Sequence, residues 1–295
     1  MPELITERSA VRRAGVGGEL PLFFSSAGRP LYGVFHPANT AIGKKQVVVI
    51  CHTIGAEHML TQRIEVLGAR VAANAGFAAF RYNARAHGDS AGEPRDLTFE
   101  DIVEDACAAA DMARELSGAS RIIWVGVRLG CLIAAEAMCR RDDAGALALW
   151  EPLHRGGDYF RAAVRSIIFA QIAKGKRPSI NVDDMLKQLE RDGELSILTG
   201  YVYRPLYRSA RETDLARSLQ NWNGNTLIVQ IQRRRTLSDD NEHLRSTLKQ
   251  RVADAKVSAV LISQELPWNI PSGDRPQWTS DDLLSATKEW LDGLE

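Results

Sequence analysis

Runs of consecutive apolar residues alternate with amphipathic stretches along most of the chain. Gln46 to His52 and Gly76 to Tyr82 have the composition of strands buried on both faces, because β-branched and other apolar residues follow one another almost without polar interruption. Between them, Arg63 to Ala75 has the apolar spacing of a helix. The alternation predicts a parallel sheet with helices on both faces.

The same alternation of apolar runs and amphipathic stretches extends on both sides of these elements. Leu20 to Phe24 and Pro30 to His36 predict an antiparallel hairpin, and Thr98 to Asp101 resembles a helix cap ahead of an amphipathic stretch that ends near Gly118. Further strands are expected at Arg121 to Val127, Ala146 to Trp150, Asn225 to Ile231 and Lys256 to Ser263, and further helices at Leu129 to Arg140, Asp240 to Val252 and Asp281 to Leu294.

The rhythm breaks between Leu153 and Trp222, where the sequence is helical, carries many Arg and Tyr residues and contains no buried strand. We interpret this segment as an inserted helical cap. The expected organisation is an N-terminal extension over 1–19, a first core part over 20–152, the cap over 153–222 and a second core part over 223–295.

Composition narrows the classes of partner. The 295 residues are 45% hydrophobic, and 37 basic residues balance 37 acidic ones, so neither nucleic acid nor an anionic membrane is an expected partner. A small anionic or acyl molecule is expected instead, and homo-oligomerisation stays open. No apolar run approaches the roughly 20 residues of a membrane span, and no signal peptide precedes the fold, which predicts a cytoplasmic protein. The four cysteines lack metal-ligand spacing, and neither a metal nor a cofactor is expected.

Gly126-Val-Arg-Leu-Gly130 lies between a predicted strand and a predicted helix, with the glycine spacing of the G-x-S-x-G nucleophile elbow. Arg128 stands where that motif has serine. A guanidinium stays protonated at neutral pH and is no nucleophile. Arg128 could bind a carboxylate or phosphate beside the start of the helix, or pair with a carboxylate of the protein itself.

Two loops add to the elbow. His52-Thr-Ile-Gly55 follows the first core strand, where an HG-type turn supplies a backbone N–H to an oxyanion hole. Asn83 to Gly92 (NARAHGDSAG) resembles the DxRGHGxSxG loop of the serine aminopeptidase-like branch of the α/β-hydrolase superfamily. That resemblance implies an α/β-hydrolase fold, with a mostly parallel central sheet, an N-terminal antiparallel hairpin, helices on both faces and a helical cap.

A narrower resemblance is to the hydrolases associated with exosortase A systems, in particular the group called hydrolase 2. The matching pieces are the elbow GVRLG, then Trp150-Glu-Pro152 with Gly156 to Arg165, and more loosely Glu265 to Trp268. The resemblance implies a role beside exopolysaccharide production and protein sorting.

The superfamily's triad needs a serine at the elbow, an acid after the strand that follows the cap and a histidine after the last strand. The chain has Arg128 at the elbow and Gln232 to Arg235 at the acid position, and Trp268 stands near the histidine position with no histidine beyond His243. We therefore expect no ordinary acyl-enzyme chemistry at residue 128.

The expected ligand-binding residues follow from these placements. Thr53, Ile54 and Leu129 frame the oxyanion position, Arg234 would make the pocket electropositive together with Arg128, and Trp268 would fill the space of a catalytic histidine.

Weaker catalytic candidates are His52, His87, Cys131 and Asp239. Each also has a structural interpretation, in which the histidines shape their loops, Cys131 packs against the sheet and Asp239 belongs to a helix cap. Three functions stay open: a non-catalytic homologue that binds an anionic or acyl ligand, an active hydrolase or acyltransferase with displaced catalytic groups, and a scaffolding subunit.

Overall fold

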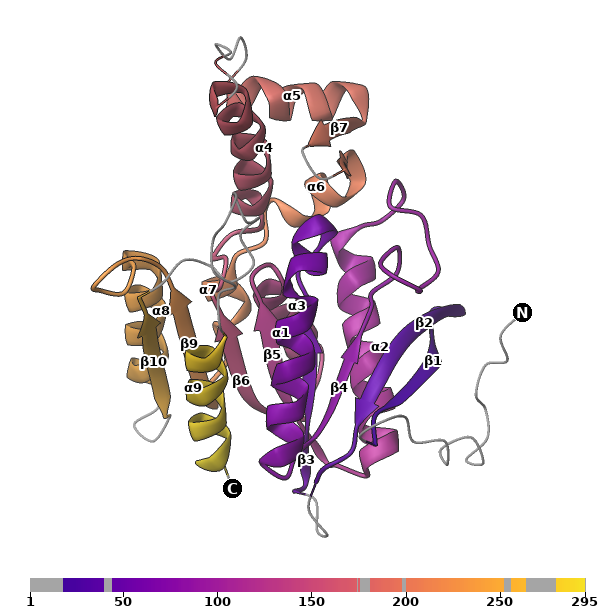
Figure 1. The fold of residues 1–295 in the computed structure, drawn as a ribbon, viewed down its shortest axis with the longest axis vertical. Helices are drawn as coiled ribbons and strands as arrows, with labels where there is room; N and C mark the ends of the chain where they lie inside the picture. Colours follow the sequence, from indigo (N-terminus) through magenta and orange to yellow (C-terminus); the bar gives the residue numbers. More distant parts are fainter. Residues whose placement is uncertain are drawn as a thin grey trace.

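The structure is a computed structural model that describes residues 18–39, 44–173, 175, 181–197, 200–251, 256–263 and 280–294. Eight strands form one sheet in the order β1-β2-β4-β3-β5-β6-β9-β10 (Figure 1). They are β1 (Leu20–Ser26), β2 (Arg29–His36), β3 (Gln46–Cys51), β4 (Ala78–Tyr82), β5 (Arg121–Val127), β6 (Ala144–Trp150), β9 (Asn225–Ile231) and β10 (Val257–Ile262).

Six of these strands are parallel to one another. β1 and β2 form the antiparallel hairpin, with Leu20 opposite Phe35, and β2 is antiparallel to β4. The remaining neighbours, from β4 to β10, all pair in parallel. The predicted fold class, a mostly parallel sheet with an N-terminal hairpin, is therefore confirmed.

Helices cover both faces of the sheet. They are α1 (Gly55–Asn74), α2 (Phe99–Ser117), α3 (Gly130–Cys139), α8 (Asp239–Arg251) and α9 (Asp281–Asp292). α2 begins at the predicted cap: Thr98 accepts a hydrogen bond from the backbone of Asp101, whose carboxylate accepts one from the backbone of Thr98. α1 begins eight residues before the predicted Arg63, because Glu57, His58 and Thr61 interrupt the apolar periodicity of its first turns.

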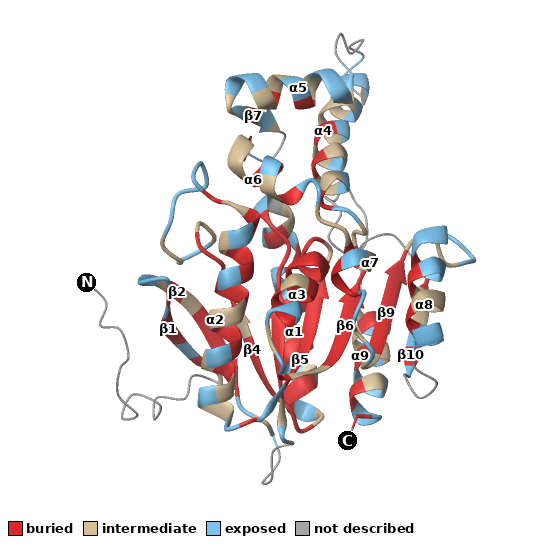
Figure 2. Ribbon diagram, turned by 180° about the vertical axis from the view of Figure 1, so that it is seen from behind, coloured by how far each residue is buried: buried red, intermediate tan, exposed pale blue. Residues whose placement is uncertain are grey.

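Side chains of each strand alternate between two apolar cores. On β3, Val47 and Val49 pack in the core that α2 and α3 cover, whereas Val48 and Ile50 pack in the core beneath α1 and α9. Figure 2 shows the buried residues concentrated in the sheet and on the helix sides that face it. Burial on both faces explains why the parallel strands are continuous apolar runs in the sequence.

The segment between β6 and β9 stands above the carboxyl ends of the strands in Figure 1. It contains α4 (Gly156–Ala173), α5 (Val182–Asp192), β7 (Glu194–Ile197), β8 (Gly200–Tyr203), α6 (Arg204–Ala210) and α7 (Leu215–Ser218). The antiparallel pair β7 and β8 was not predicted. Each of these strands has four residues and one buried side chain, Leu195 or Val202, which is too little to establish a period of two. The boundaries proposed for an inserted cap stay a prediction.

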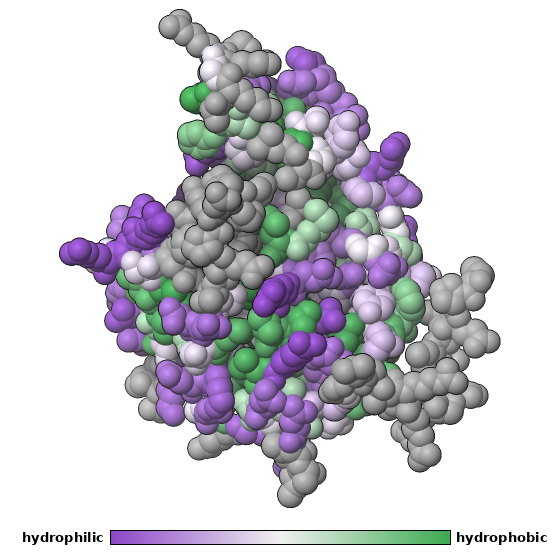
Figure 3. Space-filling model, viewed as in Figure 1, coloured by the Kyte–Doolittle hydropathy of each residue, from purple (hydrophilic) through white to green (hydrophobic). Residues whose placement is uncertain are grey.

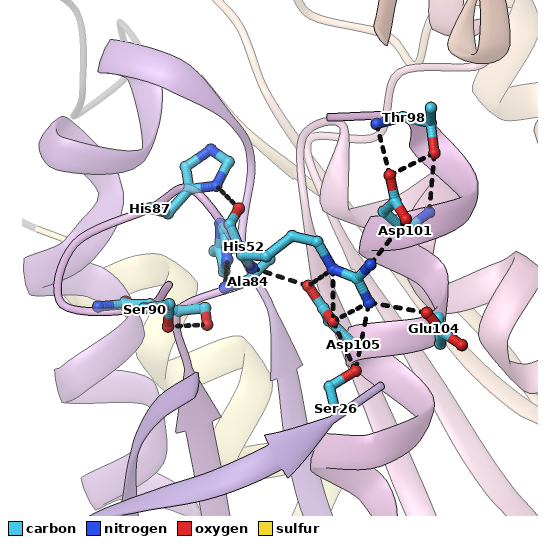
Figure 4. A network of polar contacts seen from close by, with 11 residues as sticks. Ser26, His52, Ala84, His87, Ser90, Thr98, Asp101, Glu104 and Asp105 are labelled. Atoms are coloured by element: carbon cyan, nitrogen blue, oxygen red, sulfur yellow. Dashed lines mark hydrogen bonds and ion pairs between the residues drawn. The ribbon is translucent and has the colours of Figure 1, made fainter. Parts of the chain in front are cut away.

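A buried arginine holds the β4–α2 loop in place. Arg85 is 5% exposed, and its guanidinium contacts Asp105 at 2.6 Å, Asp101 at 2.7 Å and Glu104 at 2.8 Å. Asp105 also accepts hydrogen bonds from the backbone N–H of Arg85 and from the hydroxyl of Ser26 in β1. Figure 4 shows Ser26 and the three acids gathered in this network. Arg85, the arginine of the NARAHGDSAG loop, therefore has a structural role, because its contacts hold the hairpin, the loop and α2 together.

Asp105→Ala should lower the free energy of unfolding by about 3–5 kcal/mol, because it leaves the buried charge of Arg85 without its fully buried partner. Glu104→Ala, whose side chain is 53% exposed, should cost less than about 1 kcal/mol. Urea unfolding of both variants measures the difference; equal small losses would contradict the structural role of Arg85.

Candidate functional site

The chain turns sharply from β5 into α3 at the elbow. Arg128 has φ of 56°, in the left-handed region that non-glycine residues seldom adopt. A Cβ at Gly126 would lie 2.4 Å from Cα of Cys131, and one at Gly130 would lie 2.1 Å from the carbonyl oxygen of Cys51. Both glycines are therefore required for the close approach of strand and helix, as the elbow spacing predicted.

The side chain of Arg128 is held in an ion pair. Its Nε–H donates to Glu57 Oε1 at 2.9 Å, and the hydroxyl of Thr53 donates to the other carboxylate oxygen at 2.7 Å. The two charged side chains are 14% and 19% exposed. The structure thus shows Arg128 paired with a carboxylate of the protein itself, which is one of the roles that the sequence left open.

A second carboxylate lies near the elbow. Glu151 follows β6 with φ of 47° and is 3% exposed; Gln232 donates to its Oε1 at 2.7 Å, and the backbone N–H of Ile231 donates to its Oε2. Burial raises the pKa of Glu151, although these hydrogen bonds and the positive charge of Arg128 oppose the shift. The end of β9 thus has a buried carboxylate supplied from β6, while Gln232 to Arg235 contains no acid.

Two histidines near the elbow have both ring nitrogens in hydrogen bonds. His52 accepts from the backbone N–H of Ala84 at 2.9 Å and donates from Nδ1 to the carbonyl of Thr53. His87 donates from Nδ1 to the carbonyl of Arg85 at 3.0 Å and accepts from the backbone N–H of Gly55 at 3.3 Å. Figure 4 shows His87 and His52 together beside Ala84. These bonds support the loop-shaping roles of both residues.

His58 differs from these two. Its ring stacks on His52 with 4.0 Å between centroids, and its Nε2 lies 3.6 Å from Oε2 of Glu65. Thr61 donates to the other oxygen of Glu65 at 2.7 Å. Burial lowers the pKa of His58 to about 4 and raises the pKa of Glu65.

A cavity of about 400 Å³ lies between the oxyanion turn, the β4–α2 loop and the segment that carries β8 and α6. Figure 3 shows hydrophobic residues, in green, on one face of the molecule, below the part that contains α4 and α5 in Figure 1. The cavity wall is mostly apolar and aromatic, and it contains His58 and His87 but no Lys, Arg, Asp or Glu among the residues that the structure describes. The apolar wall includes Ile54, Met59, Leu97, Phe160, Val202 and Leu206.

Tyr159 joins the cavity wall to the oxyanion turn. Its hydroxyl donates to the carbonyl oxygen of Ile54 at 2.9 Å, across 105 residues of sequence. This bond connects α4 to the turn that follows β3.

The remaining predicted ligand residues are not brought together. Thr53 and Leu129 are fully buried and are not among the residues that line the cavity, whereas Ile54 lines it. Arg234 is exposed after β9 and is not part of the cavity wall. Trp268 lies outside the described residues.

Cys131 and Asp239 have the geometry of their structural interpretations. The thiol of Cys131 donates to the carbonyl oxygen of Gly126 at 3.1 Å, and burial raises its pKa well above the ordinary value, which disfavours a thiolate nucleophile. Asp239 is exposed in the first turn of α8, where Ser238 accepts from the backbone of Asn241.

Three site residues escaped the sequence analysis: Glu57, Glu151 and Tyr159. Glu57 follows the oxyanion turn by two residues, and Glu151 stands inside the Trp-Glu-Pro motif. Their position next to these motifs is the feature of the sequence from which both acids could have been predicted as site residues. Their partners are 71, 81 and 105 residues away in sequence, which no local pattern reveals.

The sheet order, the elbow and the turns at its carboxyl edge define an α/β-hydrolase fold. The chain matches the serine aminopeptidase (S33) family over residues 43–222 and belongs to that family. Among curated proteins no match was found.

Solved structures with the same fold include esterases. Est1E from Butyrivibrio proteoclasticus with bound ferulic acid superposes with a TM-score of 0.66 at 16% identity, covering 92% of this chain and 98% of its own. The Pyrococcus furiosus esterase Pf2001 has a TM-score of 0.63 at 13% identity, covering 95% and 92%. The hydrolase GrgF from a Penicillium species has a TM-score of 0.60 at 15% identity, covering 94% and 98%. At these identities the likeness shows the fold alone.

Within the described ranges, no helix combines the length and the apolar character needed to cross a bilayer.

Replacing His58 by Phe should flatten the pH dependence of stability. The folded-state pKa near 4 lies below the unfolded value of 6.5, so the unfolded chain takes up the proton first as the pH falls, and the stabilisation present above pH 6.5 is lost toward pH 4. The groups that face His58 are His52, His87, Arg81 and Glu65. Between pH 7 and pH 5 the unsubstituted protein should lose about 2 kcal/mol more than His58→Phe.

Urea unfolding at the two pH values measures this difference. Glu65, whose raised pKa acts in the opposite sense, is present in both proteins. The exposed His243→Gln serves as the control and should leave the slope unchanged. A slope that is identical in His58→Phe and the unsubstituted protein would show that His58 is not buried in the neutral form.

Proposed function

We propose that this protein is an α/β-hydrolase homologue that binds a small apolar acyl or aromatic ligand and does not use the Ser-His-Asp mechanism. The observation that carries the proposal is the ion pair between Arg128 and Glu57 at the nucleophile position. A protonated guanidinium with its Nε bonded to a carboxylate cannot attack a carbonyl carbon, and it occupies the place from which a serine hydroxyl would do so.

The cavity favours an apolar ligand over an anionic one. The sequence predicted an anionic or acyl ligand with Arg128 and Arg234 as its contacts. Arg128 is paired with Glu57, and no cationic side chain lies in the described cavity wall. An apolar wall with a few polar groups is typical of sites for acyl chains and aromatic rings.

The setting of this function rests on the motif resemblance. GVRLG at the elbow and Trp150-Glu-Pro152 after β6 support a role beside exosortase A systems and exopolysaccharide production. We propose that the protein acts there in the cytoplasm, as a binding protein and not as an esterase.

A fluorophosphonate probe should label the protein no more than it labels a heat-denatured sample, and a panel of p-nitrophenyl esters of two to twelve carbons should show no turnover above buffer. The physical reason is the absence of a hydroxyl or thiolate nucleophile at residue 128. An active serine esterase treated in parallel is the positive control. Stoichiometric labelling or ester turnover that follows the protein through purification would overturn the proposal.

Binding is tested with neutral probes, methyl ferulate and 1-octanol, by isothermal titration calorimetry. Met59, 72% exposed at the cavity wall, is replaced by Glu, and Phe169, 67% exposed on α4 and away from the cavity wall, is replaced by Glu as the matched control. Met59→Glu should weaken binding about tenfold, equivalent to about 1.4 kcal/mol, because it places a charge beside the apolar ligand. Phe169→Glu should change the Kd less than twofold. Absence of binding at millimolar probe, or equal effects of both variants, would reject this cavity as the site.

A further inference from the structure

We propose that His58 is the hydrogen-bond acceptor of the cavity, held in that state by Glu65, and that the natural ligand is an apolar molecule with one hydroxyl or similar donor group. The inference rests on the proposed function, because it names the residue that contacts the polar group of the ligand bound in the cavity. It makes His58 a ligand-contacting residue and Glu65 a positioning residue.

Elimination among the polar groups of the cavity wall singles out His58. His87 lines the cavity, but both of its ring nitrogens are bonded to backbone groups. Tyr159 donates its hydroxyl to the carbonyl of Ile54. Tyr201 is 58% exposed and Tyr203, on which its ring stacks, is only partly buried, so bulk water competes for their hydroxyls. Among the described residues, His58 is the buried polar member of this wall whose ring has a nitrogen, Nε2, without a hydrogen-bond partner.

The position of Glu65 determines which ring nitrogen carries the proton. Oε2 of Glu65 faces Nε2 of His58 at 3.6 Å, and Nε2 is fully buried and without a hydrogen bond. A carboxylate beside Nε2 favours the tautomer with the proton on that nitrogen. Burial raises the pKa of Glu65, and the donation from Thr61 to Oε1 opposes that shift by stabilising the carboxylate form. Nδ1 is then an acceptor without a proton, and we place it toward the cavity because His58 lines that cavity while Nε2 faces Glu65.

The surroundings keep the ring neutral and fixed. The side chain of His58 is 8% exposed, and its ring stacks on His52, which is itself bonded on both sides. Because burial lowers the pKa of His58 to about 4, the imidazole is an acceptor throughout the neutral range. A neutral acceptor in an apolar wall selects for a ligand that donates a hydrogen bond and against one that offers only acceptors.

The test compares two probes of nearly equal size, 2-naphthol and 2-methoxynaphthalene, of which only 2-naphthol donates a hydrogen bond. The full chain should bind 2-naphthol about three- to tenfold more tightly at pH 7.5, measured by fluorescence titration, which is the effect of one neutral hydrogen bond. Tyr201→Phe, which removes a hydroxyl at the rim of the cavity, should preserve this ratio.

Two variants act on the acceptor itself. His58→Phe should bring the two dissociation constants to within twofold of each other. Glu65→Gln keeps the size of the side chain but replaces the carboxylate by an amide, which can donate to Nε2 and move the imidazole proton to Nδ1. The preference for 2-naphthol should then fall at least threefold, and the ¹⁵N chemical shifts of the His58 ring should show Nδ1 changing from unprotonated to protonated.

The outcomes separate the two proposals. If neither probe binds the unsubstituted protein, both the proposed function and this inference fail. If both probes bind and the ratio is the same in His58→Phe, the binding function stands and the acceptor role of His58 is overturned. If His58→Phe does not fold, the ¹⁵N spectrum of the unsubstituted protein decides. An unprotonated Nε2 of His58 would overturn the inference by itself. An unprotonated Nδ1, together with the loss of the preference for 2-naphthol in Glu65→Gln, would support it.

Discussion

At the elbow, the backbone of Gly130 packs so closely on the end of β3 that a Cβ there would lie 2.1 Å from the carbonyl oxygen of Cys51. This contact holds residue 128 at a positive φ, a conformation that costs a non-glycine residue about 1–3 kcal/mol and persists only where the surrounding structure imposes it. The side chain of residue 128 is thereby aimed at the first turn of α1, whichever amino acid occupies the position. The turn therefore has the backbone geometry of a hydrolase elbow, with an arginine as its central residue.

An arginine in that place brings a positive charge into a site that is largely shielded from water. Glu57 compensates it through a direct ion pair, and Glu151 contributes a second, buried carboxylate that is bonded to the end of β9. Each acid is supported in turn, Glu57 by the hydroxyl of Thr53 and Glu151 by Gln232. Because a buried charge without a partner is expensive, the ion pair makes Arg128 and Glu57 depend on each other.

The cavity lies next to the oxyanion turn, and Arg128 is not among the described residues that line it. The oxyanion turn contributes Ile54 to its wall, the β4–α2 loop contributes His87, and the segment between β6 and β9 contributes Tyr159 and the residues of β8 and α6. The bond from Tyr159 to the carbonyl of Ile54 fixes this segment to the core. The buried network around Arg85 fixes the loop on the other side. The cavity is thus formed by three segments that are distant in sequence, each anchored by a polar bond to a rigid element.

By itself, the sequence determined the architecture and the position of the elbow. Runs such as QVVVIC predict a doubly covered parallel sheet, because only a strand buried on both faces tolerates them, and the two elbow glycines mark Arg128 as the central residue of the turn. Only the tertiary structure decided that Arg128 pairs with Glu57, that Glu151 accepts a hydrogen bond from the backbone of Ile231 at the end of β9, and that Nε2 of His58 has no hydrogen-bond partner. These outcomes depend on which groups come within hydrogen-bond distance of one another, often between residues more than thirty positions apart. Hydrophobic periodicity reports only local burial and does not indicate such pairings.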